Sequence, residues 1–257
     1  MYKLKYIINL FLIFIFACGC ANESIDINSL DDLKNQKVGV YVGSEYDSIL
    51  KERVPDTKVS YFNNYTDQIL ALKSNKINAF LTDEPIAKEL LKMNTGLKML
   101  DESLTNDSYA FVLNKDNNDL KDKIDQVIIE MKNNGKMEYF SSKWFGDESD
   151  RILEVYDNYD YVKTIKFATV SGSAPFAYFK NNEIVGYDID IINYIGYVLN
   201  YKIEIIEMAF EGIIPAIVSD KVDVAGCSII VTEERKKSVL FSEPNYTGGI
   251  VVIVKDE

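Results

Sequence analysis

Histidine is absent from this sequence of 257 residues, which also holds only three cysteines and one tryptophan. The lack of histidine excludes Ser-His-Asp and Cys-His catalysis and every metal site built on imidazole. Two of the cysteines, Cys18 and Cys20, lie near the N-terminus, and Cys227 stands alone at the end of an apolar segment. The sequence therefore predicts no disulfide framework, no metal centre and no other cofactor. Cys227 is best interpreted as a small buried hydrophobic residue.

The chain also has fewer basic than acidic residues. The chain has 28 Lys and Arg against 40 Asp and Glu, and its formal net charge is -12. Nucleic acid and anionic lipid surfaces are therefore poor partners. A hydrophobic content of 47% with 26% charged residues is typical of a globular protein. The length is sufficient for two lobes, each with its own core.

Residues 1–20 have the pattern of an export leader. Lys3 and Lys5 precede an apolar run that is too short to span a bilayer as an ordinary helix, and small residues follow it. The end of this run resembles a bacterial lipobox. We favour Cys18 as the lipidated residue because an aliphatic residue, Ile15, stands three positions before it; Cys20 is the alternative. A plain secretory signal peptide is the competing interpretation. Either way the mature chain is expected to be exported, and with a lipid attached it is held at a membrane.

Apolar periodicity alternates between helix and strand along most of the chain, and this alternation predicts an α/β fold with mostly parallel sheets. Predicted strands cover 38–42, 57–62, 77–82, 109–114, 164–169, 202–208, 222–226 and 248–255. Predicted helices cover 44–53, 65–74, 85–93, 119–133, 136–144 and 188–200, and an apolar helical run ends at Ser219.

A helix-turn-strand unit occurs twice. The segments 69–81 (ILALKSNKINAFL) and 214–226 (IPAIVSDKVDVAG) align at Ile, Ala, Ser and Lys, and Asn78 stands opposite Asp223. The repeat predicts one such unit in each of two similar lobes.

The stretch from Phe210 to Tyr246 resembles the bacterial family 3 solute-binding proteins, the polar amino-acid receptors of ABC importers. The matching residues are Phe210, Gly212, Ile213, Pro215, Ala216, Ser219, Lys221, Asp223, Thr232, Glu234, Arg235, Lys236, Phe241, Ser242 and Tyr246. The resemblance implies two α/β lobes joined by hinge strands, which close over a small polar amino acid and deliver it to a permease.

The order of the segments is reversed relative to that family. Residues 28–114 resemble its second lobe, 115–146 its final helices and 164–257 its first lobe, with 147–163 as a linker. One interpretation is a circular permutant. The other, which we favour from the sequence because the chain stops at a hinge strand, is the front of a tandem or permease-fused receptor. In that case the two lobes belong to different binding modules.

Four residues match ligand-contacting positions of the family. The resemblance implies that Arg235 binds the ligand carboxylate, that the helix starting at Ser44 offers N–H groups, that Asp83 accepts from the ammonium group and that Phe210 forms an apolar wall. Thr232 and Phe176 are further candidates. Each has a structural alternative: a solvated charge for Arg235, helix caps for Ser44 and Asp83, and a core position for Phe210.

Several positions depart from the family pattern. Val170 and Ser173 replace a polar residue and an aromatic lid, Ser228 and Ile230 replace a glycine and a hydroxyl residue, and Glu45 stands where a small residue is usual. A carboxylate at a helix start competes with an anionic ligand. These departures favour a second hypothesis, a sensory domain or silent module that does not serve transport. A dehydratase-type enzyme on the same fold ranks lower, because no metal cluster or activated nucleophile can be assigned, and we assign no catalytic residue.

Overall fold

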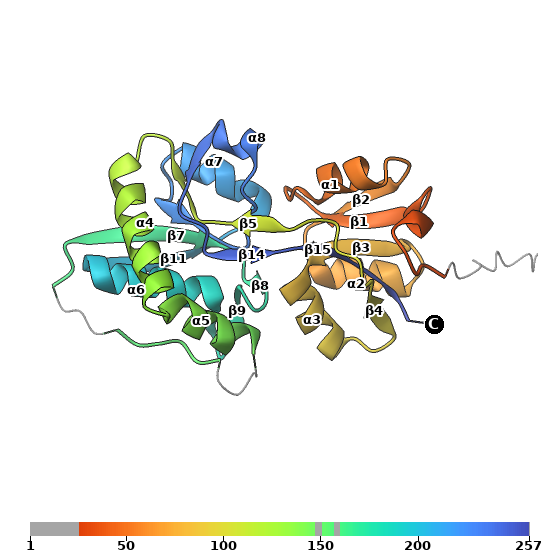
Figure 1. Cartoon of the computed structure of the whole chain (residues 1–257), viewed down its shortest axis with the longest axis horizontal. Helices are drawn as coiled ribbons and strands as arrows, with labels where there is room; N and C mark the ends of the chain where they lie inside the picture. The colour runs from red at the N-terminus through yellow and green to blue at the C-terminus, as the bar shows by residue number, and fades with distance from the viewer. Residues whose placement is uncertain (1–25, 147–150, 157–159, 257) are drawn as a thin grey trace, which may run out of the picture.

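The computed structural model describes residues 26–146, 151–156 and 160–256. Its elements form two α/β lobes joined by a narrow pair of strands, β5 (Asp107–Tyr109) and β14 (Tyr246–Gly248), which run antiparallel between them (Figure 1). The expected leader, with Cys18 and Cys20, lies outside the described residues. No helix within the described ranges is long and apolar enough to cross a membrane.

The first lobe is built on a five-stranded sheet in the order β2-β1-β3-β15-β4. Its strands are β1 (Lys37–Tyr41), β2 (Lys58–Phe62), β3 (Ala79–Asp83), β4 (Leu97–Met99) and β15 (Ile250–Lys255). Its helices are η2 (Asp31–Leu33), α1 (Tyr46–Arg53), α2 (Tyr65–Lys73) and α3 (Glu84–Met93). The sheet interior is fully apolar at its centre, where Val38, Val40 and Val252 are completely buried.

The second lobe repeats this plan with a sheet in the order β11-β7-β12-β6-β13. Its strands are β6 (Val112–Asn114), β7 (Lys163–Thr169), β11 (Tyr201–Glu207), β12 (Val224–Ala225) and β13 (Val239–Phe241), with a small sheet of β8 (Gly172–Ser173), β9 (Ala177–Lys180) and β10 (Glu183–Val185). Its helices are α4 (Asn118–Asn133), α5 (Lys136–Phe145), α6 (Tyr187–Leu199), η4 (Phe210–Gly212), α7 (Ile213–Val218) and α8 (Glu233–Lys236).

The observed sheets are less parallel than the sequence predicts. In each lobe two strand pairs are parallel and two are antiparallel. The antiparallel pairs arise because one strand runs in the opposite direction to its neighbours. This strand is β15, between β3 and β4, in the first lobe and β6, between β12 and β13, in the second. Both of these strands continue from the hinge. The α/β class is as predicted, but the sheets are mixed.

The expected lobe borders also need correction. The predicted strand 109–114 is divided, because β5 stays in the hinge and β6 joins the second sheet; β15, expected with the lobe 164–257, joins the first sheet. Val112 and Val252 are completely buried in those sheets, where they pair with Ala225 and Leu81. Helices α4 and α5 pack on α6 of the second lobe. The chain thus returns to the first lobe with β15, and the permutant and tandem interpretations both stay predictions.

The internal repeat is visible in the hydrogen bonds. The backbone N–H of Lys37, at the start of β1, donates to Asn78 Oδ1 at 3.2 Å, and that of Lys166, in β7, donates to Asp223 Oδ2 at 2.8 Å. Asn75 and Asp220 both adopt positive φ, 59° and 54°, in the turns before these residues. The two matched side chains therefore hold equivalent strands in the two lobes.

An aromatic cluster supports the hinge. Phe176 is completely buried, and its ring centroid lies 5.2 Å from that of Tyr246, 5.4 Å from that of Phe145 and 6.3 Å from that of Tyr109. Since Tyr109 and Tyr246 are the two hinge residues paired in β5 and β14, this cluster fixes the hinge to the second lobe.

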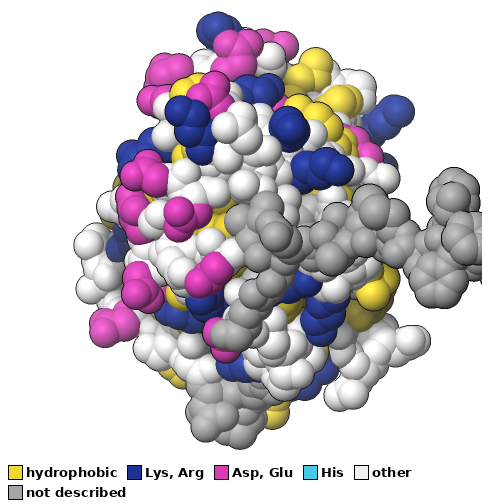
Figure 2. Space-filling model, turned by 90° about the vertical axis from the view of Figure 1, so that its right-hand side faces the viewer, with side chains coloured by type: hydrophobic (Ala, Val, Ile, Leu, Met, Phe, Trp, Pro, Cys, Tyr) yellow, Lys and Arg dark blue, Asp and Glu magenta, His cyan; other side chains and the backbone are white. Residues whose placement is uncertain are grey.

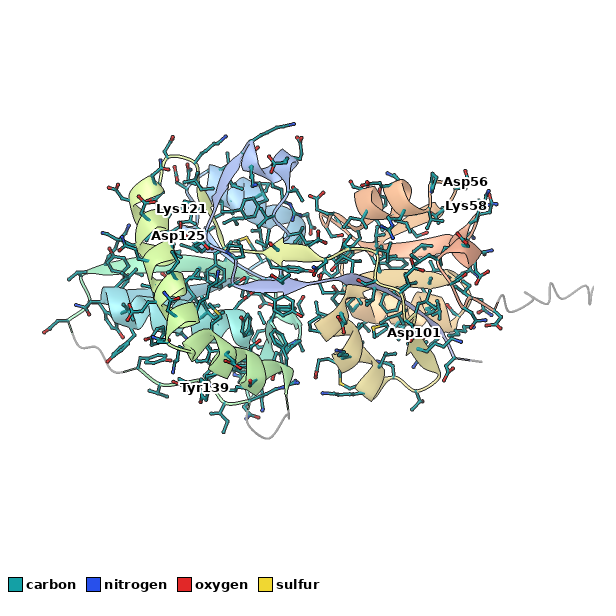
Figure 3. The ribbon with its side chains drawn as sticks, in the orientation of Figure 1. Asp56, Lys58, Asp101, Lys121, Asp125 and Tyr139 are labelled. Carbon is teal, nitrogen blue, oxygen red and sulfur yellow. The ribbon has the colours of Figure 1, made fainter. Side chains whose placement is uncertain are left out.

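The outer surfaces carry interspersed charge. On the end of the molecule shown in Figure 2, acidic and basic side chains alternate over the visible face. On the second lobe, Lys121 and Asp125 of α4 form an ion pair on the side away from the first lobe (Figure 3).

Candidate functional site

A small cavity lies between the two lobes. The first lobe lines it with Tyr41, Ser44, Glu45, Tyr46 and Tyr65, and the second with Ser173, Phe210, Cys227, Ser228, Ile230 and Arg235. The volume open to the centres of water molecules is about 20 Å³, which is enough for about one water molecule. The lobes are therefore closed on one another at this point.

Among the described residues that line the cavity, Arg235 is the only cation, and it faces the first lobe. Its side chain is 9% exposed, and its Nε lies 3.1 Å from Glu45 Oε1. Nη1 donates to the carbonyl oxygen of Ile230 at 3.1 Å, and Nη2 donates to that of Gly43 at 3.0 Å. The guanidinium thus connects the two lobes directly, and it does not lie as a solvated charge on the outer surface.

The fold positions Arg235 through a short helix. Thr232 is the N-cap of α8, and its hydroxyl accepts from the backbone N–H of Arg235 at 3.2 Å. Thr232 is not among the residues lining the cavity. Thr232 thus caps the helix that carries Arg235, and direct ligand contact by Thr232 stays a prediction.

Ser44 lines the cavity at the start of α1. Its hydroxyl donates to the Tyr41 carbonyl oxygen at 2.7 Å and accepts from the backbone N–H of Tyr46 at 3.3 Å. The helix begins one residue later than predicted, with Glu45 at the N-cap position and no capping bond from the Glu45 side chain. The Glu45 carboxylate is therefore available to Arg235.

Aromatic rings form much of the cavity wall. Phe210 is half-buried; its ring centroid lies 6.1 Å from that of Tyr41, and the Arg235 Cζ lies 5.8 Å from the Phe210 centroid. The Tyr41 centroid in turn lies 5.2 Å from that of Tyr65. Phe210 is thus a wall residue, whereas Phe176 lies in the hinge cluster and does not line the cavity.

Asp83 lies behind the cavity, at the end of β3. It occupies the N-cap position of α3 but makes no capping bond, and instead the Tyr109 hydroxyl donates to its Oδ1 at 2.7 Å. Its Oδ2 is buried and has no hydrogen-bond partner within the described residues. Burial raises the pKa of Asp83 to about 6, against the opposing effect of nearby hydroxyl groups.

A second buried carboxylate, Asp188, comes from the second lobe. It is 2% exposed and accepts from the Ser228 backbone N–H at 3.3 Å and from Asn245 Nδ2 at 3.0 Å. Burial raises the pKa of Asp188 to about 7, with the Asp83 charge acting in the same direction. No lysine or arginine among the described residues forms an ion pair with Asp83 or Asp188. Neither acid lines the cavity, and a positive group beside them would favour their ionised forms.

Several cavity residues were not singled out as contacts by the sequence. Tyr41 ends β1 and Tyr65 begins α2, so both stand at the carboxyl edge of the first sheet, where open α/β sheets hold ligands. Cys227 is 1% exposed, and burial raises the pKa of its thiol to about 12. It is buried as predicted, although it also lines the cavity. No cluster able to hold a metal ion occurs in the described part of the chain.

Residues 27–147 and 165–257 match the family model of the bacterial extracellular solute-binding proteins, family 3. The chain belongs to this family. Its members are solute-binding proteins of transporters, and the two-lobed α/β fold is the one predicted from the resemblance.

Curated relatives of this solute-binding protein are amino-acid-binding proteins. It is 32% identical over 121 residues to the L-cystine-binding protein TcyJ of Escherichia coli (strain K12), covering 47% of this chain and 46% of that protein. It is 29% identical over 126 residues to the arginine-binding extracellular protein ArtP of Bacillus subtilis (strain 168), covering 48% and 49%. The chain thus spans about half the length of the curated relatives it matches.

Among solved structures, the solute-binding protein is similar to a probable amino-acid ABC transporter extracellular-binding protein, ytmK, from Bacillus subtilis. The TM-score is 0.45 at 9% identity, and the match covers 88% of this chain and 85% of that chain.

Proposed function

We propose that this protein is an exported, lipid-anchored receptor of an ABC-type importer, and that it binds a small polar amino acid between its lobes. Closure about β5 and β14 would bring the contacts of both lobes onto the ligand, so that binding shifts the protein from an open to a closed state. The amino acids named for its relatives, L-cystine and arginine, define the class of ligand to test first.

The observation that carries this proposal is the placement of Arg235. A buried guanidinium that lies between two hinged lobes is a specific partner for a carboxylate, because its planar fork can donate two parallel hydrogen bonds. Arg235 also reaches across to the first lobe at Gly43, so a ligand held by Arg235 would meet both lobes.

The other end of an α-amino acid also has suitable partners. Asp83 supplies a buried carboxyl oxygen without a hydrogen bond, and Asp188 supplies a second carboxyl group from the opposite lobe; neither lines the cavity in the closed form. The rings of Tyr41, Tyr65 and Phe210 offer apolar walls between these charges. A zwitterion would thus find opposite charges at its two ends.

Isothermal titration calorimetry with L-arginine, L-glutamine, L-histidine and L-cystine tests the proposal. At least one of them should bind the wild-type protein, and Arg235→Ala should weaken that binding by about 30-fold or more, since the carboxylate loses a buried charged partner. Arg53→Ala is the matched control, because Arg53 lies on the outer part of α1 in a long 3.8 Å ion pair with Glu102. Equal affinity in both variants would remove Arg235 from the site.

A sensory domain that does not serve transport is the second candidate. The contact between Arg235 and Glu45 favours it, because the receptor's cation already has an anionic partner. Uptake of the bound amino acid in a strain that lacks this protein separates the two: uptake should be lost for an import receptor and retained for a sensor. Turnover of a prephenate-like acid by the purified protein would instead point to an enzyme.

A further inference from the structure

Every nitrogen of the Arg235 guanidinium has an acceptor in the protein itself. Nε faces Glu45, Nη1 donates to Ile230 and Nη2 donates to Gly43. Two of these three acceptors, at Glu45 and Gly43, belong to the first lobe. Nε and Nη2, which could otherwise face a ligand carboxylate, are therefore already engaged with the first lobe.

Glu45 brings to Arg235 the same chemical group that an amino acid would bring. Its side chain is 23% exposed and its oxygen lies 3.1 Å from Nε, within hydrogen-bond distance. The N-cap position of Glu45 keeps this carboxylate at the start of α1, and it makes no capping bond there that would turn it away. The carboxylate is thus tethered beside the guanidinium at a high effective concentration.

The cavity is too small for an amino acid while this contact is made. About 20 Å³ is open to water centres, whereas one water molecule alone needs about 10–15 Å³ by the same measure. Tyr41, Tyr65 and Phe210 fill the remaining space from both sides. A ligand can enter only if the lobes separate, and separation requires that Arg235 release Glu45 and Gly43.

We infer that Glu45 is a built-in competitor for the ligand carboxylate, which holds the ligand-free protein closed and sets its specificity. The inference rests on the proposed function for the identity of the ligand, but the closure itself does not depend on any ligand. A ligand must displace Glu45 from Arg235, so a ligand without a carboxylate gains little from Arg235, and a ligand with a well-placed carboxylate is bound below its intrinsic affinity.

The expected effect follows from the population of the open state. A largely buried ion pair that forms only in the closed state favours closure by about 10- to 100-fold. Because the apparent affinity falls with the fraction of competent protein, removal of Glu45 should strengthen amino-acid binding by a similar factor. Glu45→Ala removes the carboxylate, and Glu45→Gln removes only its charge.

Two spin labels can report closure without a ligand. Asp56 in the first lobe and Lys221 in the second are exposed, and cysteines at these positions can be labelled in a Cys18→Ser, Cys20→Ser background because the remaining Cys227 is buried. In the ligand-free protein, Glu45→Ala should lengthen and broaden the distance between the labels, and Glu45→Gln should do so to a smaller extent. Glu52→Gln, an exposed acid on the same helix, is the matched control and should leave the distances unchanged.

The outcomes separate this inference from the proposed function. If Glu45→Ala opens the free protein and gains at least 10-fold in affinity for one of L-arginine, L-glutamine, L-histidine or L-cystine, both stand. If it opens the protein but none of the four binds, the closure by Glu45 stands and amino-acid reception falls. If label distances and affinities equal those of the wild type, Glu45 is not a competitor, whatever the protein binds.

Discussion

Asp188→Asn should change how the stability of this protein depends on pH. Asp188 is buried in the second lobe, and its pKa is raised by burial from 3.8 to about 7. A carboxyl whose folded pKa is raised stabilises the fold fully below its unfolded pKa, and this contribution is lost as the pH rises through the folded pKa. The wild-type protein should therefore lose stability between about pH 4 and pH 7.

The magnitude follows from the two pKa values. The difference between 3.8 and about 7, at about 1.4 kcal/mol for each pH unit, corresponds to about 4 kcal/mol. Asparagine cannot ionise, so this loss should vanish in the variant. Asparagine retains one acceptor oxygen for Ser228 or Asn245 but not two, which costs about 1–2 kcal/mol. At pH 8 the variant should therefore be more stable than the wild type by about 2 kcal/mol.

Urea unfolding from pH 4.5 to 8, followed by fluorescence of the buried Trp144, measures the effect. The difference in unfolding free energy between variant and wild type is the relevant quantity, because other acids such as Asp83 titrate in both proteins. If the two stability profiles run parallel over this range, Asp188 ionises in the folded protein without penalty. Burial then does not raise the pKa of Asp188 as described above.

Two further predictions concern the remaining segments. Arg151→Ala should lower the unfolding free energy by about 3 kcal/mol in urea. Arg151 is 3% exposed and makes a bidentate ion pair with Glu89 of the first lobe at 2.8 and 2.9 Å. Arg53→Ala, the control, should cost less than about 1 kcal/mol, and equal losses would mean that the Arg151 pair stabilises the fold no more than a surface pair does. Cys18→Ser should abolish incorporation of labelled palmitate into the exported protein while Cys20→Ser retains it, and the reverse pattern would make Cys20 the anchor.

Local elements could be predicted from the sequence because their signals are local. The repeat at Asn78 and Asp223 predicted equivalent units, and in the structure the two side chains accept from equivalent backbone N–H groups, those of Lys37 and Lys166. The helix starting near Ser44 was placed within two residues of α1. These features depend on periodicity and turn chemistry, which act over a few residues.

Features that depend on contacts between the lobes could not be predicted. The hydrogen bond between Arg235 and Gly43 joins residues 192 positions apart, and no pattern along the chain indicates it. Phe176 lies among other aromatic residues, so its burial in the hinge is decided by neighbours from four other elements. The apolar pattern of Ile250–Lys255 would suit a strand in either lobe. Its place in the first lobe depends on the position between β3 and β4, with which it pairs.

That last strand has a consequence for the order in which the protein can fold. As the chain emerges from its amino end, β3 and β4 of the first lobe appear early, but the strand that joins them follows all the elements of the second lobe. The second lobe can assemble from one continuous stretch of chain. The first lobe keeps unpaired edges at β3 and β4 until β15 pairs with them. Folding of the early lobe is therefore coupled to completion of the late one, and a chaperone that shields those edges would raise the yield of native protein more than one acting on the second lobe.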